Sequence, residues 1–94
     1  MRQSFLVHDA DDAVGVAVQD ISPGQQVTGR VQSTGATLQV QVVQSVPLGH
    51  KIALRDITSG ESVVEYGVTI GLATSDIRAG QHVHVHNLKG QRWV

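Results

Sequence analysis

Ala36–Val43, A-T-L-Q-V-Q-V-V, is the stretch that decides the fold class. Its apolar residues Leu38, Val40 and Val42 alternate with polar ones, which is the pattern of a half-buried strand. Further short strand candidates are Val14–Val18, Lys51–Leu54, Val63–Tyr66, Thr69–Ala73 and His82–His86. No stretch has the longer period of an amphipathic helix. The sequence therefore predicts an all-β protein in which any helix is a single turn.

A short motif, D-I-x-x-G-x-x-V, occurs three times, at Asp20–Val27, Asp56–Val63 and Asp76–Val83. We expect each copy to be a tight turn in which the Asp caps N–H groups two or three residues on, the Ile fills the core and the Gly takes a positive φ. The copies are unevenly spaced, so the motif is a reused turn rather than a solenoid repeat. Arg30–Gly35 is expected to be a hairpin or exposed loop, and both chain ends are expected to be surface tails.

The composition of the 94 residues excludes several classes of protein. The length suits a single domain, 1–94. One Trp, one Tyr and one Phe predict an aliphatic core and no aromatic platform for nucleic-acid bases. The net charge is −1 and the basic residues are dispersed, which argues against nucleic acid and membrane surfaces as partners. The absence of cysteine excludes disulfides and thiolate chemistry. With no signal-peptide pattern, we expect a cytoplasmic protein.

Four of the five histidines lie in two short segments, Gly49–Lys51 and His82–Asn87. On a strand, His82, His84 and His86 would share one face, and neighbouring side chains on that face lie about 6.5–7 Å apart. Two imidazoles at that spacing can converge on one metal ion or substrate. The alternative is a solvated polar strand face.

The same reasoning gives expectations for the residues around these histidines. Val83 and Val85 should face the core, and His50 should lie across the surface from the H-V-H-V-H strand. His8, beside an acidic run, is a further candidate for the same site. The alternatives are an ordinary turn at His50 and a solvated turn at His8. Without a complete catalytic motif in the chain, a second protein surface would have to form the other wall of such a site.

Several runs together resemble the N-terminal SAF-type module of the UxaA family. They are Asp11–Ile21, Val46–Ile57, Val64–Gly71 and Ala79–Asn87, and they fall in the family's order over nearly the whole chain. The resemblance implies a β-clip fold and a carbon–oxygen or carbon–sulfur lyase, because the family includes altronate and galactarate dehydratases and sulfolactate sulfo-lyases. It also implies a divalent metal, typically iron, held mainly by a large catalytic subunit.

The resemblance implies roles for particular residues. His50, His84 and His86 are the expected catalytic residues. The expected substrate-binding residues are Lys51 and Asn87, to which the acidic run beside His8 adds His8 as a further candidate, and the expected metal ligands are His82 and His84. The substrate would be a small hydroxy acid or a sulfonate, and the isolated chain would be inactive. Gly29–Val43 is long and Gln-rich for a sugar-acid member, and the end at Val94 favours a separate small subunit.

Two other hypotheses remain open from the sequence. The chain could be a non-catalytic carbohydrate-binding SAF module, with incidental histidines, or a structural subunit that supports a larger partner. Self-association into a homo-oligomer is also left open. The tail Lys89–Val94 carries Trp93 after the basic residues Lys89 and Arg92, and we expect this aromatic side chain to anchor the partner. The alternative is a frayed end.

Overall fold

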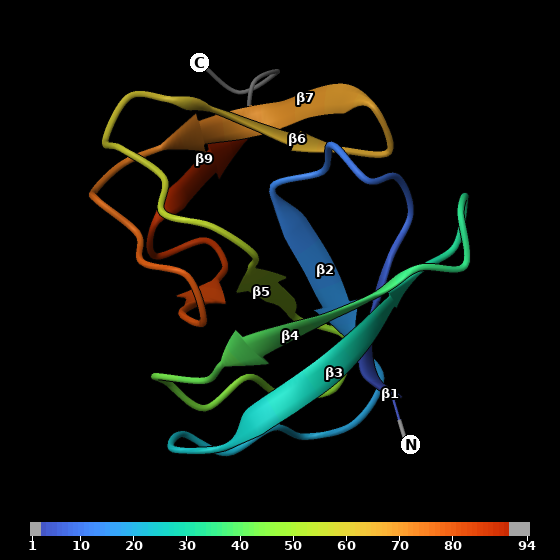
Figure 1. Cartoon of the computed structure of the whole chain (residues 1–94). Helices are drawn as coiled ribbons and strands as arrows, with labels where there is room; N and C mark the ends of the chain where they lie inside the picture. Colours follow the sequence, from blue (N-terminus) through green and yellow to red (C-terminus); the bar gives the residue numbers. More distant parts are fainter. Residues whose placement is uncertain (1–2, 91–94) are drawn as a thin grey trace.

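The computed structural model describes residues 3–90, and within that range the chain forms nine β-strands and no helix (Figure 1). The strands are β1 (Gln3–Val7), β2 (Val14–Ala17), β3 (Gln26–Val31), β4 (Thr37–Gln41), β5 (Lys51–Ala53), β6 (Ser62–Glu65), β7 (Val68–Ala73), β8 (His82–Val83) and β9 (Leu88–Gly90). The all-β prediction is confirmed. The described part of the chain also contains no helix that could cross a membrane.

The strands form two sheets. The larger has the order β4-β3-β1-β2-β5-β8, and the smaller has the order β6-β7-β9. Strands β1 and β3 pair in parallel, whereas the other neighbours pair antiparallel. In Figure 1 the smaller sheet lies above the larger one. Register places Lys51 of β5 between Val16 of β2 and Val83 of β8, so these three side chains share one face of the larger sheet.

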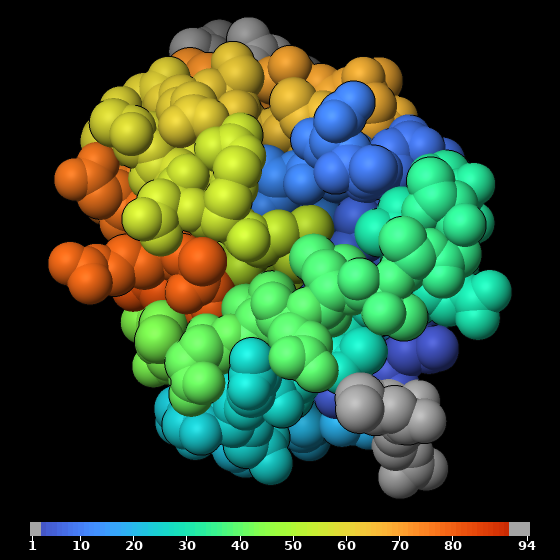
Figure 2. Space-filling model, in the orientation of Figure 1, coloured from blue at the N-terminus to red at the C-terminus, as the bar shows by residue number. Residues whose placement is uncertain are grey.

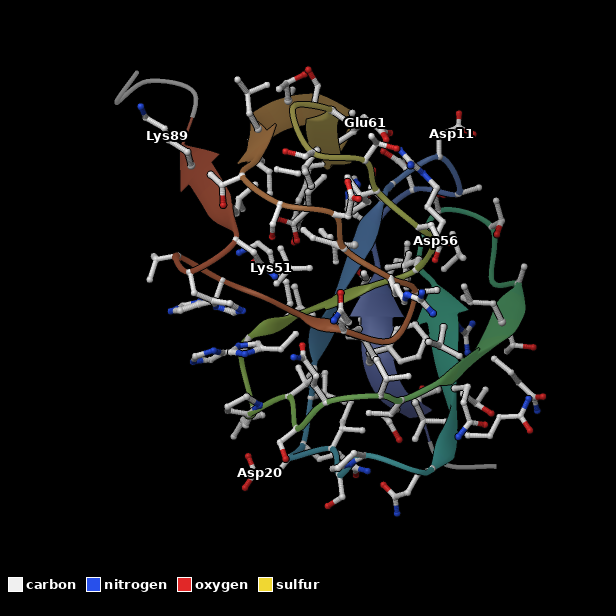
Figure 3. The ribbon with its side chains drawn as sticks, turned by 90° about the vertical axis from the view of Figure 1, so that its left-hand side faces the viewer. Asp11, Asp20, Lys51, Asp56, Glu61 and Lys89 are labelled. Carbon is white, nitrogen blue, oxygen red and sulfur yellow. The ribbon has the colours of Figure 1, made fainter. Side chains whose placement is uncertain are left out.

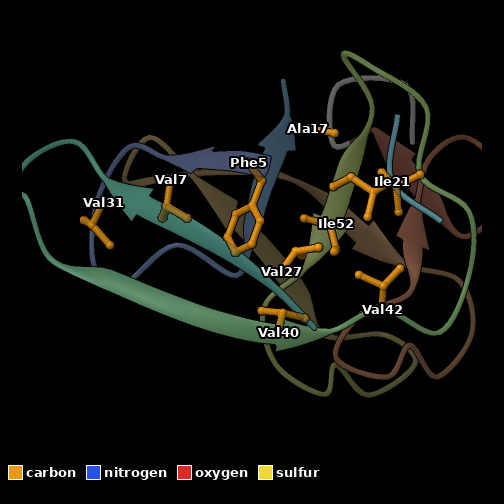
Figure 4. Packing of buried hydrophobic residues seen from close by; sticks show 10 residues of the cluster. Phe5, Val7, Ala17, Ile21, Val27, Val31, Val40, Val42 and Ile52 are labelled. Carbon is orange, nitrogen blue, oxygen red and sulfur yellow. The ribbon is translucent and has the colours of Figure 1, made fainter. Parts of the chain in front are cut away.

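The core is aliphatic, as predicted, apart from one aromatic ring. Phe5 is fully buried at the centre of a cluster that lines the larger sheet (Figure 4). A methyl group at Gly29 of β3 would overlap the Phe5 ring, so this glycine makes room for the ring. A second cluster, which includes Val63, Ile77 and Val83, lies between β8 and the smaller sheet. The second cluster supports the segment that carries most of the histidines.

The strand predictions for the middle of the chain are confirmed by β2, β4, β5, β6 and β7. The prediction that both ends are surface tails is wrong within the described residues. Phe5 makes β1 a central strand, and Lys89 and Gly90 belong to β9, which pairs with β7. The expected loop at Arg30–Gly35 begins two residues late, because Arg30 and Val31 complete β3. The predicted anchor Trp93 lies outside the described residues.

The D-I-x-x-G motif forms a tight turn in all three copies. Its Ile side chains are buried, and its glycines Gly24, Gly60 and Gly80 have φ of 88°, 87° and 88°. The predicted role of the Asp is wrong. Asp56 accepts a hydrogen bond from the Ala79 N–H at 2.9 Å and Asp20 accepts one from the Leu48 N–H at 2.8 Å, so each Asp joins one turn to another. The residue after the glycine caps the turn instead. In the second copy, for example, the Glu61 carboxylate accepts a hydrogen bond from the Thr58 N–H.

The partner of the first turn is a fourth copy at residues 45–52, S-V-P-L-G-H-K-I. Val46 is buried and bridges Ile21, just as Ile57 bridges Ile77, and Gly49 has a φ of 85°. In the other turns, the N–H of the fourth residue donates to the Asp of the paired turn. The fourth residue of the first turn is Pro23, which has no N–H, so no Asp is needed at position 45 to accept from it. The two pairs of turns therefore share one geometry despite their different sequences.

Candidate functional site

His50 owes its place to the fourth turn. In the other turns the residue after the glycine caps an N–H three residues back, as Gln81 does for Arg78 at 2.6 Å. In the fourth turn the residue three back is Pro47, which has no N–H to donate. His50 therefore has no N–H to cap within its own turn, and its imidazole contacts His82 of β8 instead.

Three histidines converge at the junction of β5 and β8. His50 Nδ1 lies 2.8 Å from His82 Nε2, and the His50 ring stacks on the His84 ring with centroids 4.1 Å apart. One nitrogen from each of the three rings lies within 4.8 Å of the other two. We call these three residues the histidine cluster. The prediction that His50 lies beside the H-V-H-V-H segment is confirmed.

The predicted strand over His82–His86 is wrong beyond Val83. Strand β8 ends there and a turn follows, so Val85 is 82% exposed, whereas Val83 is fully buried as expected. The turn still gathers the imidazoles: the His82 ring lies 5.6 Å from the His84 ring and 5.1 Å from the His86 ring, centroid to centroid. The histidines are therefore grouped by a turn and not by one face of a strand.

Asn87 holds this turn closed. Its side-chain oxygen accepts a hydrogen bond from the His84 N–H, and its amide nitrogen donates to the His82 carbonyl, each at 2.9 Å. The residue is buried, with 6% of its surface exposed. Its polar atoms are thus engaged within the turn that carries the cluster, and this placement makes Asn87 a positioning residue for His82 and His84.

The surroundings favour the neutral form of two of these imidazoles, those of His82 and His84. Partial burial, followed by the neighbouring histidines His86, His50 and His84, lowers the pKa of His82 below its usual value. Loss of hydration and then the charges of His50, Lys51 and His86 lower the pKa of His84. A neutral imidazole can accept a proton or bind a metal ion. The cluster therefore suits either kind of chemistry.

Lys51 connects the cluster to a buried carboxyl group. It leaves β5 on the side of the smaller sheet (Figure 3) and, with His84 and Val85, lines a depression of about 250 Å³. Its charge also acts on Glu65 of β6. Burial raises the pKa of Glu65, and the Lys51 charge opposes this effect in part. An acid, a cation and the imidazoles thus follow one another along the junction of the two sheets.

His8 belongs to a different surface from the cluster. Its ring stacks on Tyr66 with centroids 4.2 Å apart, and its Nδ1 lies 3.2 Å from Asp9 Oδ2. With Tyr66, Glu65 and Val16 it lines a cavity of about 200 Å³. Val16, which lines this cavity, pairs with Lys51 on one side, and Val83 of β8 pairs with Lys51 on the other. The cavity and β8 therefore lie on opposite sides of Lys51.

Sequence reasoning missed Glu65 and Tyr66. Glu65 is 8% exposed and lies two residues after the buried Val63. Residues two apart on a strand share one face, so the spacing from Val63 could have indicated that this acid faces the core. Tyr66 has a positive φ of 58°, which is uncommon for a residue with a side chain. The carboxylate of Asp12 stabilises this conformation by accepting hydrogen bonds from the Tyr66 and Gly67 N–H groups.

Comparisons with known proteins show which family the chain belongs to. A family model described as the altronate/galactarate dehydratase SAF domain matches residues 3–91. The chain is 50% identical to the (2R)-sulfolactate sulfo-lyase subunit alpha of Chromohalobacter salexigens over 94 residues, which cover 99% of this chain and 100% of the relative. It is 36% identical to the subunit of the same name from Paracoccus pantotrophus over 63 residues, 67% of this chain and 94% of that one.

Larger enzymes match as well. The chain is 42% identical to the altronate dehydratase of Escherichia coli over 87 residues, which are 93% of this chain and 16% of the enzyme. The matched sequence thus corresponds to the whole of a relative named as a subunit and to a minor part of a longer enzyme. The chain belongs to the family of SAF domains of altronate and galactarate dehydratases.

Proposed function

We propose that this chain is the small subunit of a two-component UxaA-type lyase and supplies histidines to a site shared with a large catalytic subunit. The histidine cluster at the junction of β5 and β8 is the observation that carries the proposal. The preferred reaction is elimination of sulfite from sulfolactate, because the chain covers the whole of a relative named as subunit alpha of such a sulfo-lyase. The alternative reaction, dehydration of an altronate-like or galactarate-like sugar acid, is favoured by the similarity to altronate dehydratase.

The surroundings of the cluster fit a site that is closed by a partner. Leu48, two residues before His50, is 61% exposed, and Val85, between His84 and His86, is 82% exposed. Exposed apolar side chains beside a polar cluster favour a protein–protein contact. Figure 2 shows the orange segment that leads into β8 at one edge of the molecule, against the green segment after β4. A partner that covers the exposed side chains around the histidine cluster would exclude water from the imidazoles.

The reaction requires one acid–base pair and charge stabilisation. A base removes the proton from the carbon that bears the carboxylate and the hydroxyl group, a carbon–carbon double bond forms, and the bond to sulfur breaks as sulfite leaves with the electron pair. The resulting enol takes a proton on carbon and becomes the keto acid. In the dehydration, a hydroxyl group leaves with a proton in place of sulfite. Proton transfer by a positioned imidazole contributes about 10²–10⁴-fold to the rate of such steps.

Each predicted residue has a role in this proposal. His50, His84 and His86 transfer protons at the substrate, since imidazole is the side chain best suited to acid–base chemistry near neutral pH. Lys51 binds the substrate carboxylate as a cation. His8 binds a distal group of the substrate if the substrate extends past Lys51 toward the 200 Å³ cavity. Asn87 binds the substrate beside His84 in this proposal, and it also positions the histidines through the turn that it closes.

A divalent metal ion, iron in our proposal, is held mainly by the large subunit. When bound, it polarises the substrate carboxylate and stabilises the developing enolate. The three imidazole nitrogens of the cluster are suitable ligands for such an ion, so the chain's donor set fits a metal-dependent partner. The chain's own residues then orient the substrate and move protons at the edge of that centre.

Location and other partners follow from the same argument. We propose a cytoplasmic protein that binds neither nucleic acid nor membranes, and whose residues 1–94 form a single SAF domain. A homo-oligomer of the whole complex is compatible with the proposal. A non-catalytic carbohydrate-binding module is the competing function, and binding of a sugar acid by the isolated chain without activity in any complex would support it.

The direct test is reconstitution. The chain is co-expressed with the large subunit of a sulfo-lyase, and sulfite release from (2R)-sulfolactate is measured for the complex and for each component. We expect activity only in the complex. Turnover by the isolated chain would contradict the proposal, as would full activity of the large subunit alone. Altronate and galactarate in the same assay decide between the two reactions.

The predicted role of the C-terminal tail is tested in the same system. Because Lys89 and Gly90 belong to β9, the truncation should begin at Gln91. If Trp93 anchors the partner, deletion of residues 91–94 weakens co-purification with the large subunit and leaves the thermal stability of the isolated chain unchanged. Unchanged complex formation and activity would show that the tail makes no contribution.

A further inference from the structure

We propose that this chain holds a first-row transition-metal ion of its own, bound by His50, His82 and His84, with coordination positions left open toward the partner. This goes beyond the proposed function, in which the metal ion belongs mainly to the large subunit. While the ion is bound, His50 and His84 serve as its ligands, and His86 is the imidazole that remains for proton transfer. It also differs from the expectation that His82 and His84 alone ligate a metal, because the structure adds His50 from the fourth turn. The inference concerns binding by the isolated chain and does not depend on the partner.

The distances between the donor atoms support the site. Ligand nitrogens of a tetrahedral ion with metal–nitrogen bonds of about 2.0–2.1 Å lie about 3.3 Å apart. His50 Nδ1 and His82 Nε2 are 2.8 Å apart, so they need to separate by about half an ångström. The third nitrogen lies within 4.8 Å of the others and approaches by rotation of a side chain at the surface. Small side-chain movements therefore complete a three-nitrogen site.

The backbone that carries the ligands is fixed by contacts independent of any ion. His82 lies in β8 opposite Ile52, and its N–H donates to the Gln44 side chain at 3.0 Å. Asn87 binds the backbone of both His82 and His84. Strand pairing, the fourth turn and the Asn87 turn thus place three imidazoles at one point without a hydrophobic reason for doing so. A site that is formed before the ion binds has less conformational entropy to lose.

The donor set determines the class of ion. Imidazole nitrogen favours zinc, copper, nickel, cobalt and iron, whereas magnesium and calcium require oxygen ligands. The nearest cation, Lys51, donates no lone pair while protonated and leaves the three imidazoles as the ligands. Three protein ligands leave a tetrahedral ion with an open position, which is the arrangement of catalytic rather than structural zinc sites. A substrate oxygen or a partner side chain can occupy it.

The test uses the full chain without a polyhistidine tag, after removal of metal ions by a chelator. Cobalt(II) is titrated in, and its visible absorption bands report nitrogen coordination; zinc is then added to displace it. His50→Ala and His84→Ala remove ligands at a turn and at the surface. His8→Ala is the matched control, because it removes an imidazole that stacks on Tyr66 instead. Circular dichroism establishes that each variant is folded.

We expect one cobalt ion per chain, displacement by zinc, and no competition from magnesium. Loss of outer-sphere partners of metal ligands costs about 10–100-fold in affinity, so loss of a ligand should weaken binding by about 100-fold or more. His8→Ala should bind like the wild type. The proposal is overturned if the chain gives no cobalt spectrum, or if folded His84→Ala binds as tightly as the wild type. A chain that binds no ion but restores sulfite release would overturn the metal site and leave the proposed function intact. A chain that binds the ion but restores no sulfite release would contradict the proposed function and leave the metal site intact.

Discussion

Asn87→Ala should destabilise the protein by about 2 kcal/mol while leaving its fold intact. The side chain makes two hydrogen bonds to backbone groups, the His84 N–H and the His82 carbonyl, each at 2.9 Å. A hydrogen bond contributes about 1 kcal/mol net, and a partner that stays buried without water loses more. In a domain of this size, 1 kcal/mol shifts the melting temperature by about 4–8 °C. We therefore expect a decrease of about 8–16 °C.

The assay is thermal and urea unfolding of the isolated chain, followed by circular dichroism. Gln44→Ala is the matched control, because Gln44 also accepts one hydrogen bond from β8, the His82 N–H, but at an exposed position where water can replace it. Its loss should be within about 0.5 kcal/mol. If Asn87→Ala is as stable as Gln44→Ala, the turn does not depend on Asn87 and our account of how the histidines are grouped is incorrect.

Two further variants test other parts of the structure. Glu65→Gln should raise the free energy of unfolding at pH 7. Burial raises the pKa of Glu65 above 4.5, so this group favours the folded state below about pH 4.5. That contribution to stability is lost as the pH rises through the folded-state pKa. Urea unfolding at several pH values should show the difference from the wild type shrinking toward pH 4, and a difference independent of pH would contradict the account. Gly29→Ala should be destabilising by about 1–3 kcal/mol, because its methyl group would overlap the buried Phe5 ring. A Gly29→Ala variant that is as stable as the wild type in thermal unfolding would argue against the packing of Phe5 on Gly29.

The local patterns that were predictable are those set by side-chain alternation. Val40 and Val42 are buried as their alternation indicates, and so is Val83. The strand β1 was missed because its apolar run, Phe5 to Val7, is short and does not alternate with polar residues. The space at Gly29 of the paired strand β3 gives the Phe5 ring its place. The end of β8 was missed because Val85 continues the alternation, while Asn87 closes a turn that the alternation does not encode.

The candidate site was predictable in composition but not in geometry. The residue types at 50, 82, 84 and 86 indicated a shared site, and His50 does meet His82 and His84. The prediction of a common strand face failed, since a hydrogen-bonded turn brings these rings together instead. The fourth turn was hidden because Ser45 and Val46 replace the Asp and Ile of the motif. Its physical signature was the pair of prolines, Pro23 and Pro47, at positions where the other turns need an N–H.

The measurement that tests the central claim most directly is turnover by the reconstituted complex with His84→Ala. This variant keeps the Asn87 turn, because the hydrogen bond to residue 84 comes from its backbone N–H. We expect the variant to co-purify with the large subunit like the wild type and its kcat for sulfite release to fall by about 100-fold or more. A complex that forms normally and turns over at the wild-type rate would contradict the claim that this chain supplies histidines to a shared active site.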